Sequence, residues 1–126
     1  MKIQPDVINV QSISGYGPGW IGIGSEKIYA SVVISSLGKR IEWDCRRFED
    51  LSEAHFVQVA NLGAELVIFG SGKRLRFPQP AWIKPLIERQ TGIETMDTDA
   101  ACRTYNILAA EGRHVALALL LESDAL

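Results

Sequence analysis

The sequence predicts an α/β fold in which an antiparallel β-meander comes first and a half of alternating helices and strands follows. Three observations lead to this prediction. Short segments of strand-like composition follow one another up to residue 43, with turn signals between them. From residue 52 onward, segments with helical spacing alternate with short apolar runs, which is typical of a mainly parallel sheet covered by helices. One of these runs, Leu66 to Phe69, is apolar throughout, as expected of a strand buried on both faces.

The meander is predicted from segments that are β-branched, aromatic or alternating in polarity. The expected strands cover residues 7–14, 20–23, 28–35 and 40–43. Glycine-rich or short polar clusters at 15–19, 25–27 and 37–39 separate them and are predicted to be turns. Strands at such short intervals indicate antiparallel neighbours.

The second half begins with a helix that follows Ser52, a favourable N-cap residue. Gly63 is placed to end this helix in a left-handed C-cap, and the apolar stripe that predicts its buried face consists of Ala54, Phe56, Val57 and Ala60. After the apolar strand, the alternation of residues 74–77 predicts a short, half-exposed strand. Two prolines then favour a helix that becomes regular near Lys84 and is capped by Gly92.

Two strands and one helix complete the prediction. A strand is expected over residues 93–96, and a helix follows it, with Asp97 or Thr98 as its N-cap and Gly112 as its stop. The side of this helix that is expected to face inward carries Ala101, Tyr105, Leu108 and Ala109. The last strand, residues 114–121, is apolar on both faces from residue 115 onward.

Length and charge limit the possible classes of protein. The 126 residues fit one domain, which we place at residues 1–126. A domain of this size buries roughly two-thirds of the surface of its unfolded chain, so it needs no disulfide or metal for stability. The net charge of −2 provides no attraction to nucleic acid or to anionic membranes, and neither is expected as a partner.

The cysteines and the apolar runs predict a cytoplasmic protein. Cys45 and Cys102 are far apart, and no Cys/His cluster suits a metal. The first residues have no apolar core, so no signal peptide is expected. The longest apolar run, residues 115–121, is too short to span a bilayer.

The best candidate site is the loop after the buried strand, Gly70-Ser71-Gly72-Lys73. In α/β sheets, ligands bind just beyond the carboxyl ends of the strands. The loop is not a P-loop, because Val67 stands where the motif requires glycine and Arg74 stands where it requires Ser or Thr. Two interpretations remain: a small anion nest of backbone N–H groups, or a plain glycine turn, which is the favoured one.

The second part of the candidate site is the start of the helix after residue 96. Asp97 and Thr98 would lie beside the glycine loop if their strands are neighbours, although both are also ordinary N-cap residues. Cys102 lies about one turn inside the helix, where a helix dipole can activate a thiol; the favoured alternative is a buried, inert cysteine. Arg103 is included because it could point at the same pocket.

Motifs for known chemistry are missing from the sequence. There is no Gly-x-Ser-x-Gly elbow, no HExxH zinc motif and no dinucleotide-binding fingerprint. Neither His55 nor His114 is placed by the sequence beside Cys102. We therefore assign no catalytic residue, no metal and no cofactor.

Five short motifs, taken together, resemble one known family. They are FGSG at 69–72, RFP at 76–78, MDT at 96–98, TYN at 104–106 and EGR at 111–113. The chain resembles the Mth-type domain family of small α/β proteins, whose eukaryotic members include a mitochondrial respiratory complex I assembly factor and an adipogenesis-associated protein. The resemblance implies three layers, with a central mixed sheet of about five strands, one of them antiparallel to the rest, and an extra β layer. It implies no established catalytic activity and no known cofactor.

Two hypotheses for function follow. The first is a non-catalytic binding or assembly module that acts through an unknown protein partner or through self-association, and it predicts an exposed apolar surface. The second is a site for a small molecule or anion, possibly enzymatic, between the glycine loop and the helix start, and it predicts a concave pocket there.

Overall fold

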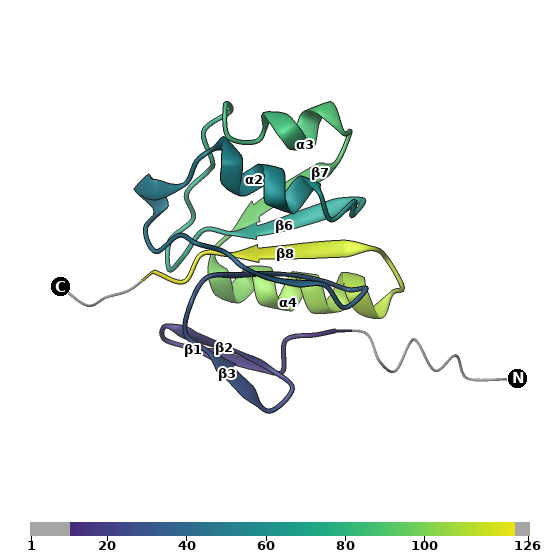
Figure 1. Cartoon of the computed structure of the whole chain (residues 1–126). Helices are drawn as coiled ribbons and strands as arrows, with labels where there is room; N and C mark the ends of the chain where they lie inside the picture. Colours follow the sequence, from purple (N-terminus) through teal and green to yellow (C-terminus); the bar gives the residue numbers. More distant parts are fainter. Residues whose placement is uncertain (1–10, 123–126) are drawn as a thin grey trace, which may run out of the picture.

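The computed structural model describes residues 11–122, and a five-stranded mixed sheet lies at its centre (Figure 1). The strands lie in the order β5 (Arg40–Glu42), β4 (Val32–Ser35), β8 (Val115–Leu119), β6 (Leu66–Gly70) and β7 (Gly92–Met96). The last three are parallel, and β4 is antiparallel to both of its neighbours. β4 is therefore the single reversed strand that the family resemblance implies. β8 occupies the middle position, with β6 beside it.

A second sheet is formed by β1 (Gly15–Gly17), β2 (Trp20–Ile23) and β3 (Glu26–Ile28), all antiparallel. Two of the expected turns are therefore shorter than predicted, because residues 15–17 and 26–27 pair as strands. The single strand expected over 28–35 is wrong, since the chain leaves one sheet after Ile28 and enters the other at Val32. Of the strand expected over 7–14, residues 7–10 lie outside the described residues and 11–14 are not in a strand.

The helices cover both faces of the large sheet and create three layers (Figure 1). A short 3-10 helix, η1 (Phe48–Asp50), precedes α2 (Glu53–Ala60), and α2 lies with α3 (Lys84–Glu88) on one face. The opposite face carries α4 (Thr98–Ala110) together with the small sheet. The predicted three-layer α/β fold is confirmed. Two further details are wrong: α2 buries Phe56, Val59 and Ala60 while Ala54 and Val57 are exposed, and residues 74–77 form no strand.

Both faces of β6 are buried, which explains its unbroken apolar sequence. Val67 and Phe69 belong to the core under α2 and α3, whereas Ile68 belongs to the core under α4. Phe69 packs edge-on against Trp43 and Phe56, at centroid distances of 6.1 and 5.5 Å. The strand therefore separates two apolar cores and lies in neither alone.

The TYN motif ties the chain before β1 to α4. The Tyr105 hydroxyl donates to the carbonyl of Gln11 at 2.6 Å. The amide of Asn106 bonds both backbone groups of Ile13, accepting from its N–H at 2.8 Å and donating to its carbonyl at 2.9 Å. These contacts satisfy backbone groups that no neighbouring strand pairs, so the motif has a structural role.

Gln90 ends α3 in a left-handed conformation with φ of 57°, where the sequence analysis had placed the cap at Gly92. Thr91 donates its N–H to Leu86 O at 2.9 Å, which is the bond expected just beyond such a residue. We expect Gln90→Gly to raise the free energy of unfolding by about 0.5–1 kcal/mol. Glycine removes the Cβ strain of the left-handed conformation, and this gain is larger than the extra chain entropy that glycine loses on folding. Urea denaturation measures this, with Gln90→Ala as the control that should change little. A Gln90→Gly protein no more stable than the alanine variant would contradict the interpretation.

Candidate functional site

A pocket of about 390 Å³ opens at the edge of the large sheet where the parallel strands have their carboxyl ends. Its lining comes from four segments: the hairpin between β1 and β2, the loop after β6, the start of α4, and the chain after β8. The lining residues are Tyr16, Gly17, Pro18, Gly19, Gly72, Lys73, Asp97, Thr98, Asp99, Leu120, Leu121 and Glu122. The volume falls within the range of small-molecule sites.

Backbone hydrogen bonds join the glycine loop to the start of α4. Ser71 donates its N–H to Met96 O at 2.8 Å, and Thr98 donates its N–H to Gly72 O at 2.8 Å. Asp97 caps α4 by accepting the N–H of Ala100 at 2.9 Å. The two segments that the sequence analysis expected to be neighbours are therefore in direct contact.

The structure brings four of the eight predicted site residues to the pocket: Gly72, Lys73, Asp97 and Thr98. Gly70 and Ser71 are buried behind it. Cys102 is fully buried in the core under α4. Arg103 lies outside the lining but donates to the hydroxyl of Tyr16 at 2.9 Å, so it holds one lining side chain in place.

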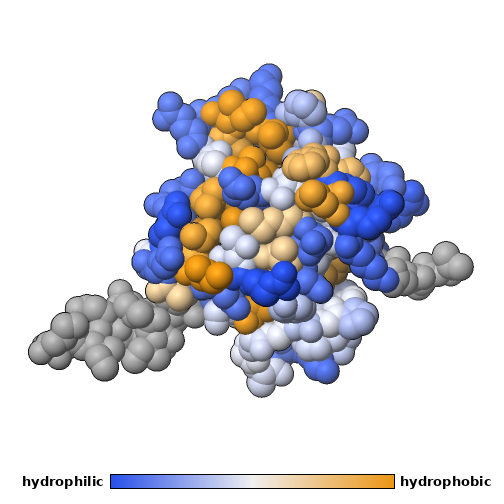
Figure 2. All heavy atoms as spheres, turned by 180° about the vertical axis from the view of Figure 1, so that it is seen from behind, coloured by the Kyte–Doolittle hydropathy of each residue, from blue (hydrophilic) through white to orange (hydrophobic). Residues whose placement is uncertain are grey.

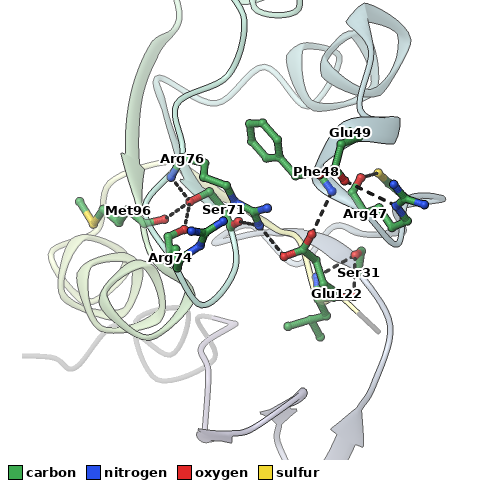
Figure 3. Close-up of polar contacts among 11 residues, drawn as sticks. Ser31, Arg47, Phe48, Glu49, Ser71, Arg74, Arg76, Met96 and Glu122 are labelled. Atoms are coloured by element: carbon green, nitrogen blue, oxygen red, sulfur yellow. Dashed lines mark hydrogen bonds and ion pairs between the residues drawn. The ribbon is translucent and has the colours of Figure 1, made fainter. Parts of the chain in front are cut away.

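The loop after β6 is held by a polar network that ends at Glu122 (Figure 3). The Ser71 hydroxyl donates to Arg74 O at 2.8 Å and accepts the N–H of Arg76 at 2.9 Å. The Arg76 guanidinium donates to Ser71 O at 2.7 Å and pairs with the carboxylate of Glu122. Glu122 also accepts the N–H of Phe48 at 3.0 Å, and the guanidinium carbon of Arg76 lies 4.6 Å from the centroid of the Phe48 ring.

Gly72 is required at its position for two reasons. Its φ is 111°, which side chains rarely adopt, and an added Cβ would lie 2.7 Å from Arg76 Nη2 and 2.9 Å from Glu122 Oε1. The loop therefore runs directly against the ion pair. The positive φ and this contact account for the second glycine of the FGSG motif, and the anion nest stays a prediction.

The charges around the pocket are balanced. Lys73 is the cation among the lining residues, against the carboxylates of Asp97, Asp99 and Glu122. Arg76 pairs with Glu122 just behind the lining. The Tyr16 hydroxyl first, and then Asp97 and Asp99, raise the pKa of Arg103 at the rim.

Cys102 lacks the properties of a nucleophile. Burial raises the pKa of its thiol to about 12. His55 lies across the sheet, on α2, where its Nδ1 accepts the N–H of Ser52 at 3.1 Å and its Nε2 lies 2.8 Å from Asp44 O. The interpretation of Cys102 as an inert core residue is the one that the geometry supports.

We expect Cys102 to react with Ellman's reagent at pH 8 about a thousandfold more slowly than an exposed thiol, because a pKa of about 12 against 9.0 removes that much thiolate. Single-cysteine variants that lack Cys45 or Cys102 separate the two rates, and urea gives the rate of the unfolded chain. Faster labelling of Cys102 than of Cys45 in the native protein would contradict the assignment.

Part of the lining was missed in the sequence analysis. The segment at 15–19 reads as a turn between strands, and nothing in it indicates that Tyr16 reaches the start of α4. The lining residues at 120–122 follow an apolar strand. The sequence does not indicate the ion pair of Glu122, because its partner Arg76 lies 46 positions earlier.

Comparisons with known proteins place the chain in a family. A model of the family described as a protein of unknown function (DUF498/DUF598) matches residues 13–120. A Bos taurus protein named NADH dehydrogenase (ubiquinone) 1 alpha subcomplex assembly factor 3 is 32% identical over 82 residues, which cover 64% of this chain and 45% of that protein. The chain thus spans less than half the length of this relative. A Francisella tularensis protein named 13 kDa major membrane protein is 24% identical, over 57% of this chain and 58% of that protein.

Solved structures agree with this assignment. The crystal structure of a Bordetella parapertussis protein is 34% identical, with a TM-score of 0.84 over 90% of this chain and 97% of that one. The solution structure of a Bordetella pertussis protein described as an Mth938-like domain has a TM-score of 0.82 and 27% identity, covering 100% of this chain and 93% of that one. Among residues 11–122, no helix combines the length and apolar character that crossing a bilayer requires. The chain belongs to the DUF498/DUF598 family of Mth938-like α/β domains.

Proposed function

We propose that this chain is a non-catalytic binding module that acts in the cytoplasm, through a protein partner, in the assembly of a larger protein complex. The observation that carries this proposal is the sequence relationship to proteins named as assembly factors of NADH dehydrogenase. The burial of Cys102 supports the non-catalytic part of the proposal, because this cysteine lies in the core under α4 and the pKa of its thiol is raised to about 12.

The crossover between β6 and β7 supplies an apolar surface suited to a partner. Leu75 is 52% exposed, Phe77 is 69% exposed and Ile87, on α3, is 61% exposed. We call these three residues the crossover surface. Figure 2 shows hydrophobic side chains at the surface of the α3 end of the molecule, with more between α3 and α4. Large apolar side chains exposed on one connection favour contact with another protein.

The test is affinity purification of the tagged full chain from its own cells, followed by sizing at micromolar concentration. We expect the wild type to bring down a defined partner or to self-associate, and Phe77→Ser/Ile87→Ser to lose that association. Ile107→Ser is the matched control, because Ile107 is 60% exposed on α4, away from the crossover. An isolated monomer under both conditions would refute the proposal.

A second candidate function is the binding of a small molecule or anion in the pocket of about 390 Å³. The pocket lies at the position that the glycine loop and the helix start predicted, and its balanced charges favour a polar or zwitterionic ligand. Nuclear magnetic resonance titrations with inorganic phosphate and with free amino acids test this. Saturable shifts at Tyr16, Gly72 and Asp99 would support a ligand site, and shifts with neither probe would count against it.

A further inference from the structure

The outer edge of β7 presents backbone groups that have no partner among residues 11–122. β7 pairs with β6 on one side and ends the sheet on the other. Gly92 donates its N–H to Glu65 O and Met96 accepts from Ser71 N, so the backbone groups of these two residues point toward β6. Because these groups alternate along a parallel pair, the N–H and C=O groups of Ile93 and Thr95 point away from the sheet.

This edge lacks most of the features that protect sheet edges. β7 pairs with β6 over its whole length of five residues in a regular register, without a bulge. Residues 91–100 contain no proline, lysine or arginine. Glu94, in the middle of the strand, is exposed.

The two sides of the edge differ in chemistry. On the side of α3, Ile93 packs against the core under α2 and α3, and Ile87 of the neighbouring helix is 61% exposed. Side chains alternate between the two faces of a strand, so Glu94 and Met96 lie on the opposite face of β7 from Ile93, on the side of α4. Residues 91–100 contain no cation, and Glu94 is the carboxylate of β7 itself, because Asp97 and Asp99 lie beyond the strand and line the pocket.

The charge of Glu94 discriminates between partners. A second copy that paired antiparallel about Glu94 would set one carboxylate directly opposite another, which is destabilising. A segment that carries Lys or Arg opposite Glu94 would gain the opposite-charge pair instead. Charge complementarity therefore favours a different, basic chain over self-pairing.

We propose that β7 is the docking edge for an extended segment of a protein partner, which adds as a sixth strand to the large sheet. The segment bonds the outward backbone groups of Ile93 and Thr95. Its apolar residues face α3, and its alternate residues include Lys or Arg beside Glu94. This inference rests on the proposed function, and it specifies how the partner binds.

The probe is a capped heptapeptide of alternating lysine and valine, titrated into the full chain labelled with nitrogen-15. We expect saturable shifts of the amides of Ile93 and Thr95 and slower exchange of these amides with solvent. Thr95→Pro removes an outward N–H without removing a bond to β6, and it should weaken binding about tenfold or more. Thr95→Val keeps that N–H and should bind like the wild type.

Glu94→Lys is a second variant that does not alter the backbone. It should lose affinity for the lysine peptide and gain affinity for the equivalent glutamate–valine peptide. Unchanged amides of Ile93 and Thr95 in the wild type, or equal binding by Thr95→Pro, would overturn the docking edge. If the cellular partner is retained by Thr95→Pro but lost by Phe77→Ser/Ile87→Ser, this inference is wrong and the proposed function stands. If the wild type retains no partner and does not self-associate, the proposed function itself is wrong.

Discussion

Gly70→Val is expected to lower the free energy of unfolding by about 3 kcal/mol, because the end of β6 has no room for a side chain. A Cβ at Gly70 would lie 2.5 Å from Leu119 Cδ2 and 3.1 Å from the Cβ of Ala101. Both neighbours are fully buried, so neither can move into solvent. Urea denaturation followed by circular dichroism measures the loss.

Gly15→Ala is the control for this substitution. Gly15 also lies in a strand, but its added Cβ would meet only the Trp20 ring, at 3.7 Å or more, which is ordinary contact. Its effect should stay within about 0.5 kcal/mol. A Gly70→Val protein as stable as the control would show that β6, β8 and α4 are not packed closely at this edge.

Arg76→Met is expected to destabilise the protein by about 2–3 kcal/mol. The substitution leaves the half-buried Glu122 carboxylate without its cation and the carbonyl of Ser71 without its donor. Breaking a fully buried pair costs about 3–5 kcal/mol, and the 21% and 27% exposure of these side chains reduces that figure.

Arg40→Met provides the matched control. Arg40 forms an equally good pair with Glu26, but those side chains are 37% and 57% exposed, so Arg40→Met should destabilise the protein much less than Arg76→Met. A double-mutant cycle of Arg76→Met with Glu122→Gln gives the pairwise energy directly. Equal losses for Arg76→Met and Arg40→Met would contradict a structural role for the network.

Apolar runs, helical spacing and cap residues were enough to predict β2, β6 and α4. β2 was predicted at its exact bounds, β6 to within one residue, and α4 with Asp97 as one of two alternative N-caps and Gly112 as the residue that stops it. The sequence predicts a turn where β1 forms, because glycine suits a turn and also suits a strand on which a neighbouring side chain packs closely. At Gly17 the covering residue is Trp20, whose indole lies where a Cβ would be.

Only two walls of the candidate site could be predicted: the loop after β6 and the start of α4 after β7, which follow neighbouring parallel strands. The order of β6 and β7 was enough to place Gly72 and Lys73 beside Asp97 and Thr98. The remaining walls come from β1–β2 and from the chain after β8, whose positions depend on tertiary packing. The Arg76–Glu122 pair was invisible for the same reason.

The joining of the β6 loop to the start of α4 underlies the pocket, and one measurement tests it directly. A scalar coupling across the hydrogen bond from the Thr98 N–H to the Gly72 carbonyl can be detected by nuclear magnetic resonance in the doubly labelled chain. The distance of 2.8 Å predicts that this coupling is observable. Its absence, with rapid exchange of the Thr98 amide with solvent, would mean that the two loops do not meet and that the pocket is not formed as described.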